Sequence, residues 1–327
     1  MDIESINSLS VSEVPKDTIR PLWSIVIPTY NCAHYLKETI ESVLKNGLSE
    51  DDMEIIVIDD NSDKDDPKKV VDQFGRGRVK FHQQEKNVGK GRNYGTGLQM
   101  TKGHFIHLLH GDDTVENGFY KKIESLFDKN SEASAAFCRC NYINAESNII
   151  GETSLISKDE GLVSDFLIKI ATWQLIQPPS IVFKRKVYET LGTYDLRLKY
   201  IEDWEFYVRA AVKFKYVYTP EIYANYRIFS QNSSSQSIKG GKRVATIAQV
   251  FSIIDDYLPH EVKRKVEAER DNASAVYLLN FIPKLMADKD FKGLFVVTKA
   301  FCRYNKKLRL WGRWFRFVTQ YPKFNKR

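Results

Sequence analysis

Short runs of apolar and β-branched residues alternate with segments of helical periodicity through the first half of the chain. Such runs predict buried strands, whereas apolar positions three and four residues apart predict amphipathic helices. Strand–helix alternation at this spacing predicts crossover connections, and therefore an α/β fold with a mainly parallel central sheet flanked by helices. Strands are predicted at 23–30, 53–60, 78–83, 104–110 and 133–143, helices at 32–47, 66–75 and 115–129, and a loop entering a helix at 89–103.

The regular alternation fades after residue 150. Helices are predicted at 163–173 and 202–214, with short strands between and after them. A polar, serine-rich stretch then separates this region from a mostly helical remainder. The predicted organisation is a flexible leader (1–22), an α/β domain (23–230), a linker (231–242) and a helical, basic C-terminal region (243–327).

Charge is distributed unevenly along the 327 residues, whose net charge is +7. Residues 291–327 contain 11 Lys and Arg and no Asp or Glu, whereas the rest has 38 basic against 42 acidic residues, a net of −4. The chain contains no uncharged apolar run of about 18 residues, and its first residues have no apolar signal core. The four cysteines fit a reducing compartment, so a cytoplasmic location is expected.

Polar residues follow the predicted strands where each strand ends, at 28–31, 59–62 and 110–113. Open α/β sheets bind ligands outside the carboxyl ends of their strands. Tyr30 could stack on a planar ligand, and Asp60 could accept a hydrogen bond from its ring N–H. Alternatively, Asn31 and Asp60 are ordinary turn and cap residues.

The stretch "NVGKGRNYG" (87–95) resembles a phosphate cradle without matching the common phosphate-binding motifs. Gly89 and Gly91 would allow close backbone approach, and Arg92 could pair with an oxyanion at the N-terminus of the following helix.

Two acidic pairs, far apart in the sequence, are candidates for chemistry. Asp112 and Asp113 follow a buried strand, where Mg²⁺ or Mn²⁺ would offset their mutual repulsion. Glu202 and Asp203 begin a predicted helix, where a positioned carboxylate could act as a general base. In each case the alternative is a helix-capping role.

Taken together and in order, the segments "SIVIPTYN", "EIIVIDDNSDKDD", "NVGKGRNYG", "LLHGDDTVENGFY" and "EDWEFYVRA" resemble the family 2 glycosyltransferases with the GT-A fold. The resemblance covers residues 24–230. It implies inverting transfer of a sugar from a nucleotide-diphosphate donor, a UDP-sugar, to a hydroxyl of a glycan or lipid-linked acceptor. It also implies a nucleotide-binding half at 23–113 and an acceptor half at 114–230.

The resemblance assigns roles to residues that match the family's motifs. The nucleotide and its diphosphate would be held by residues of the first half, namely Pro28, Tyr30, Asn31, Asp60, Gly89 and Arg92. Asp112 would bind Mn²⁺ or Mg²⁺, with Asp113 near the donor sugar. Asp203 would be the catalytic base.

Two positions depart from the family pattern. His110 stands where the family usually has the first Asp of its D-x-D motif, and Phe229 stands where many relatives have a histidine after "YR". Asp112 would then be the main protein ligand of the metal, and His110 is retained as a candidate ligand.

The mixture of cations and aromatic residues at 291–327 predicts docking on an anionic membrane surface, and hence a peripheral location at the inner face of the cell membrane. The alternative is a helix packed on the core with a solvated basic face. The interpretation is an enzyme of polysaccharide, lipopolysaccharide or capsule biosynthesis, with no nucleic-acid partner. A nucleotidyltransferase and a non-catalytic sugar-nucleotide-binding relative are the alternatives.

Overall fold

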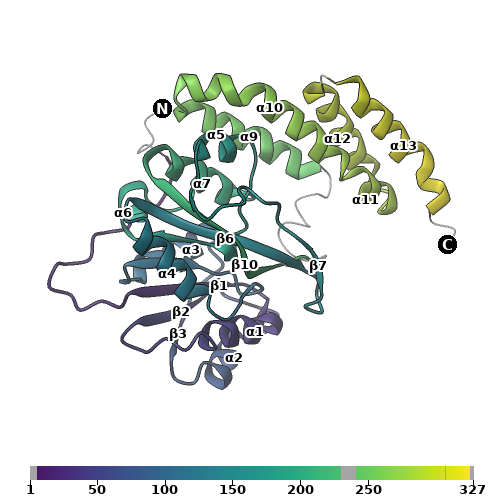
Figure 1. The fold of residues 1–327 in the computed structure, drawn as a ribbon. Coiled ribbons are helices and arrows are strands. Elements are labelled where there is room, and N and C mark those ends of the chain that lie inside the picture. Colours follow the sequence, from purple (N-terminus) through teal and green to yellow (C-terminus); the bar gives the residue numbers. More distant parts are fainter. Residues whose placement is uncertain (1–5, 230–240, 306, 325–327) are drawn as a thin grey trace. The chain divides into compact units, whose positions relative to one another are not determined.

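The computed structural model describes residues 6–229, 241–305 and 307–324. The chain forms two compact units, which we describe separately (Figure 1). The first comprises 1–166 and 175–228, and the second comprises 167–174 and 229–327. The predicted linker at 231–242 lies outside the described residues except at its last two positions, where Lys242 begins a helix.

A ten-stranded sheet forms the centre of the first unit. Its strands are β1 (Trp23–Thr29), β2 (Met53–Asp59), β3 (Val79–Gln83), β4 (Phe105–Leu108), β5 (Thr114–Val115), β6 (Ala133–Ile143), β7 (Ile149–Glu152), β8 (Gly161–Leu162), β9 (Ile181–Lys184) and β10 (Lys215–Arg227). The main order is β3–β2–β1–β4–β9–β6–β10–β5, with β7 paired to β6 and β8 to β10. Neighbours from β3 to β4 are parallel, β9 is antiparallel to both its neighbours, and β6 and β10 are parallel. The predicted α/β fold is confirmed, and its sheet is mixed in the second half.

Helices cover both faces of this sheet. They are α1 (Ala33–Leu44), α2 (Pro67–Phe74), α3 (Lys90–Met100), α4 (Phe119–Lys129), α6 (Lys186–Leu191) and α7 (Glu202–Lys213), with the 3-10 helix η2 (Pro178–Ser180). Apolar residues of α1 and α4 share a core with alternate residues of β1 and β2, such as Ile25 and Ile55. On the opposite face, α3 approaches closely because Gly97 has no side chain beside Val26 and Ile58.

The N-terminal residues from 6 to 12 pack along the first unit. Ile6 and Val11 are buried, Leu9 N–H donates to Thr193 Oγ1 at 3.0 Å, and Thr193 N–H donates to the Leu9 carbonyl at 2.9 Å. The prediction of a flexible leader therefore does not describe these residues. Two buried apolar side chains and paired backbone groups fix them, although the segment has no apolar run that would signal this.

The second unit is helical. It contains most of α5 (Phe166–Thr172), followed by α9 (Lys242–Tyr257), α10 (His260–Leu279), α11 (Ile282–Ala287), α12 (Phe291–Tyr304) and α13 (Leu308–Phe324). Its core is built from buried residues of α10, α11 and α12, including Leu279, Ile282 and Phe301. Among the described residues, no helix is both long and apolar enough to cross a membrane.

Candidate active site at the carboxyl edge of the sheet

Three polar segments meet where β1, β2 and β4 end. Asp60 N–H donates to the Thr29 carbonyl at 3.0 Å, and Gly111 N–H donates to the Pro28 carbonyl at 3.0 Å. These bonds continue the parallel pairing of β1 with its two neighbours. Residues 28–31, 59–62 and 110–113 therefore share one edge, because parallel strands present their carboxyl ends on the same side.

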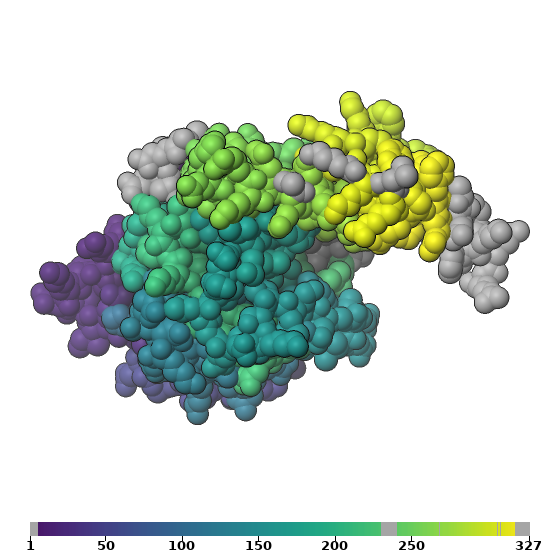
Figure 2. Space-filling model, turned by 45° about the horizontal axis from the view of Figure 1, so that its top comes forward, coloured from purple at the N-terminus to yellow at the C-terminus, as the bar shows by residue number. Residues whose placement is uncertain are grey.

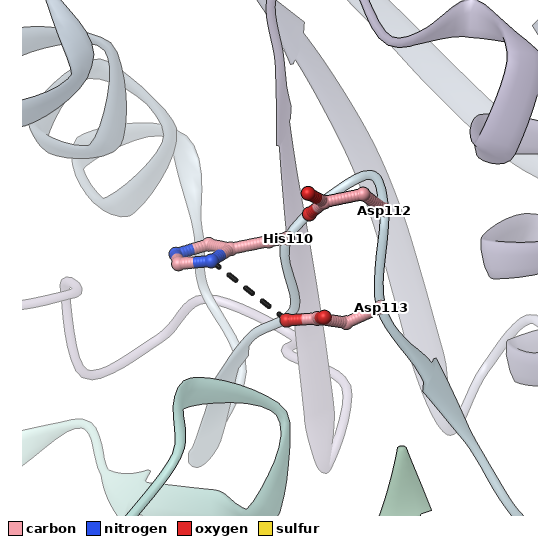
Figure 3. Close-up of side chains that lie close together, drawn as sticks. All are labelled: His110, Asp112 and Asp113. Atoms are coloured by element: carbon pink, nitrogen blue, oxygen red, sulfur yellow. Dashed lines mark ion pairs between the residues drawn. The ribbon is translucent and has the colours of Figure 1, made fainter. Parts of the chain in front are cut away.

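His110, Asp112 and Asp113 form a compact cluster at this edge (Figure 3). One potential ligand atom from each residue lies within 4.8 Å of the other two, and His110 Nδ1 is 3.8 Å from Asp113 Oδ2. Asp113 Oδ1 accepts a hydrogen bond from Arg227 N–H at 2.9 Å. Asp113 Oδ2 is buried and accepts no hydrogen bond from any described residue. An unpartnered buried carboxylate oxygen is costly, so this site favours a cation.

The protonation properties of the cluster are consistent with a metal site. Burial raises the pKa of Asp112 to about 6, and burial together with the charge of Asp112 raises the pKa of Asp113 well above its usual value. Burial, aided by Lys90, lowers the pKa of His110 to about 3, so its imidazole is neutral and able to bind a metal. One neutral imidazole and two carboxylates fit a divalent cation, which would offset the repulsion between two adjacent negative charges, one of them buried.

Arg227 organises the loop that carries the cluster. Its side chain is buried in β10, and its guanidinium lies 4.4 Å from the centre of the Tyr35 ring. Arg227 Nε donates to the Asp112 carbonyl at 2.8 Å, and Nη2 donates to Glu38 at 2.6 Å. The charge of Arg227 also lowers the pKa of both aspartates, against the effect of burial. The sequence analysis missed this residue, although an arginine in a buried strand is itself a signal of a polar network.

Asp60 and Asn31 hold loops of the predicted nucleotide site. The two carboxylate oxygens of Asp60 accept from Val88 N–H at 2.7 Å and from Gly89 N–H at 3.0 Å. Asn31 Oδ1 accepts from the backbone N–H groups of residues 63 and 64, both at 3.0 Å. Both side chains thus have the loop-fixing role that the turn interpretation allowed. Tyr30 is 45% exposed, so its ring is open to stacking.

The glycine-rich stretch enters α3 at this edge. Gly89 adopts a φ of +84° at the N-cap, a conformation that glycine accommodates without strain. Arg92, in the first turn of α3, is exposed. Lys90 Nζ lies 2.8 Å from Glu202 Oε1, and so joins this helix start to the start of α7.

Asp203 is half-buried in the first turn of α7, next to the buried Glu202. Between α7 and the metal-type cluster lies Tyr94, whose ring stacks on His110 with 5.3 Å between ring centres. Burial raises the pKa of Tyr94, and the charges of Glu202, Asp112 and Asp203 raise it further. Tyr94, which the sequence analysis did not single out, therefore faces both acidic groups.

Comparison with known proteins identifies the family of the chain. The model for glycosyl transferase family 2 matches residues 24–192, just over half of the chain. An uncharacterized glycosyltransferase of Methanocaldococcus jannaschii is 26% identical over 227 residues, which cover 68% of this chain and 76% of that protein. TarP of Staphylococcus aureus, a poly(ribitol-phosphate) beta-N-acetylglucosaminyltransferase, is 34% identical over 113 residues, or 33% of each chain.

Two solved structures share the fold. Residues 1–349 of S. aureus TarS, in complex with UDP-GlcNAc, superpose with a TM-score of 0.62 and 16% identity, covering 91% of this chain and 80% of that one. A mannosyltransferase from Pyrobaculum calidifontis, in complex with GDP-Man and Mn²⁺, gives a TM-score of 0.54 and 14% identity, covering 96% and 90%. The chain therefore belongs to glycosyl transferase family 2 and has the GT-A type of α/β fold, as its motifs predicted.

Proposed function

We propose that this glycosyltransferase transfers a sugar from a UDP-sugar to a hydroxyl of a glycan or lipid-linked acceptor, with inversion at the anomeric carbon. The observation that carries the proposal is the cluster of His110, Asp112 and Asp113, in which the buried Asp113 has an unpartnered carboxylate oxygen at the ligand-binding edge of the sheet. The UDP-GlcNAc complex of TarS and the acetylglucosaminyltransferase activity named for TarP support a UDP-sugar donor.

The donor nucleotide would bind over β1 and β2. Tyr30 would stack on the base because its ring is exposed there. Pro28, Asn31 and Asp60 would shape the floor, since their polar groups already bind neighbouring backbone atoms. Arg92 would pair with the diphosphate from the first turn of α3, and Gly89 would permit close approach.

A divalent cation would be held by Asp112, with Asp113 and His110 within reach. Mn²⁺ or Mg²⁺ supplies charge neutralisation of the leaving diphosphate when bound. The protein's own contribution is to keep the His110 imidazole neutral, to bury the Asp113 carboxylate and to hold the loop through hydrogen bonds from Arg227.

Asp203 would act as the base. Inversion requires in-line attack from the side opposite the diphosphate, so the base and the metal would lie on opposite sides of the anomeric carbon. The Asp203 carboxylate would take the proton of the acceptor hydroxyl as its oxygen bonds to the anomeric carbon. The bond to the diphosphate breaks in the same step, and its electron pair leaves on the diphosphate.

The helical unit would dock on an anionic membrane surface, which suits a lipid-linked acceptor at the inner face of the cell membrane. On α12, Phe291 and Phe295 are each 70% exposed and one helical turn apart, beside the exposed Lys292. Phe315 on α13 is 57% exposed between the exposed Arg313 and Arg316. The segment α13 is yellow in Figure 2. Exposed aromatic rings flanked by cations favour the interface of anionic bilayers.

A thermal-shift screen of UDP, UDP-GlcNAc, other UDP-sugars and GDP-mannose, with and without Mn²⁺, would test the donor assignment. A donor that binds the folded state raises the melting temperature by mass action. We expect a metal-dependent shift with UDP-sugars that Asp112→Asn removes. An equal shift in that variant would contradict the metal assignment, and no shift with any UDP-sugar would contradict the donor assignment.

A further inference from the structure

Glu202 has one carboxylate oxygen without a partner in the interior of the first unit. The residue is 3% exposed. Its Oε1 accepts the ion pair from Lys90 Nζ at 2.8 Å, whereas its Oε2 is fully buried and accepts no hydrogen bond from any described residue. A buried carboxylate oxygen normally has a donor, so a missing donor indicates a place for a ligand group.

Glu202 contacts an element that borders the proposed donor site. Lys90 is the first residue of α3, and it directly follows Val88 and Gly89, whose N–H groups are held by Asp60 at the end of β2. Tyr94, one turn further along α3, stacks on His110 of the metal-type cluster. Glu202 is thus attached to the helix that borders the donor site, while its neighbour Asp203 lies in the first turn of α7.

We propose that Glu202 Oε2 accepts a hydrogen bond from a hydroxyl of the donor sugar and thereby selects the sugar that is transferred. This inference rests on the proposed function, because it requires a nucleotide sugar in the site. Lys90 pairs with Oε1, and the second oxygen is left for the ligand. A buried polar group discriminates strongly against a ligand that lacks its partner, since the group is then left unpaired.

Calorimetric titration in the presence of Mn²⁺ would separate this role from a general role in the nucleotide site. The titrants are UDP, UDP-GlcNAc and UDP-GlcNAc analogues that each lack one hydroxyl. For Glu202→Gln we expect UDP-GlcNAc to bind roughly tenfold more weakly, with UDP affinity unchanged. Wild type should lose a similar factor with one deoxygenated analogue, and Glu202→Gln should not distinguish that analogue from the parent donor.

Lys90→Met provides the matched control, because it breaks the same ion pair but keeps the carboxylate. It should still discriminate the parent donor from that analogue. If Glu202→Gln lowers the affinities for UDP and UDP-GlcNAc equally, the inference is overturned. It is also overturned if the variant changes only the KM for the acceptor, because the hydroxyl that Glu202 binds would then belong to the acceptor. Failure of wild type to bind any nucleotide sugar would instead overturn the proposed function, and this inference with it.

Discussion

Replacing Arg227 with methionine tests how the chain stabilises two adjacent aspartates, of which Asp113 is buried and Asp112 half-buried. The methionine retains much of the apolar stem but removes a guanidinium that donates to the Asp112 carbonyl at 2.8 Å, the Asn144 carbonyl at 3.1 Å and Ser147 Oγ at 2.9 Å. It also removes the ion pair with Glu38 at 2.6 Å. The loop that carries the metal-type cluster then loses its main anchor to β10.

The size of the effect follows from burial. The Glu38 side chain is 48% exposed, so its ion pair is screened and contributes only about 0–1 kcal/mol. Hydrogen bonds from a charged donor contribute about 1.5–3 kcal/mol each, and freed carbonyls recover part of this from water, so a total of about 3–5 kcal/mol is expected. This is a large share of a folding stability of about 5–15 kcal/mol.

Urea unfolding of wild type, Arg227→Met and Glu38→Gln would measure this. We expect the first variant to lose about 3–5 kcal/mol and the second, which removes only the exposed carboxylate, to lose less than about 1 kcal/mol. Similar losses of unfolding free energy in both variants would refute the reasoning, because the exposed ion pair with Glu38 would then account for the whole effect of Arg227. A loss below about 1 kcal/mol for Arg227→Met would refute it as well.

Three further changes test other parts of the molecule. Gly97→Ala places a methyl group 2.4 Å from Val26 Cγ1, so the free energy of unfolding should fall by about 1–3 kcal/mol in urea titrations; an unchanged value would contradict the close approach of α3. Asp60→Asn can accept from only one of its two amide partners, so calorimetry should show UDP binding weakened about tenfold; unchanged affinity would contradict the loop-fixing role. Phe295→Ser should lower the affinity for anionic vesicles, measured by co-sedimentation, about tenfold. If wild type binds neutral vesicles as strongly as anionic ones, docking does not depend on charge.

The strands and their common edge could be predicted from sequence because each depends on local pattern. The apolar run before Pro28 and the one before Asp60 each read as a buried strand, and parallel pairing then places both ends together. The same reasoning placed Asp112 at this edge. The sequence did not decide whether Asn31 binds the ligand or stabilises a turn, because an asparagine side chain can form the hydrogen bonds of either role.

The missed residues act through contacts between distant segments. Arg227 bonds to residues that lie more than 80 positions earlier. Glu202 was a candidate from the sequence, but its ion pair with Lys90, between α7 and α3, was not predicted. No local periodicity encodes such pairs. Residues 6–12 were misjudged for the same reason, since their partners, including Thr193, lie in the second half of the first unit.

We propose above that Asp203 is the base of the sugar transfer, and that the donor binds at the site that contains Asp112 and Asp113. The most direct measurement is release of UDP from UDP-GlcNAc, or from the UDP-sugar that binds best, by wild type and Asp203→Asn with Mn²⁺. For Asp203→Asn we expect donor affinity within twofold of wild type and turnover at least about a hundredfold lower, because the acceptor hydroxyl then has no base. Turnover equal to that of wild type would show that Asp203 is not the base.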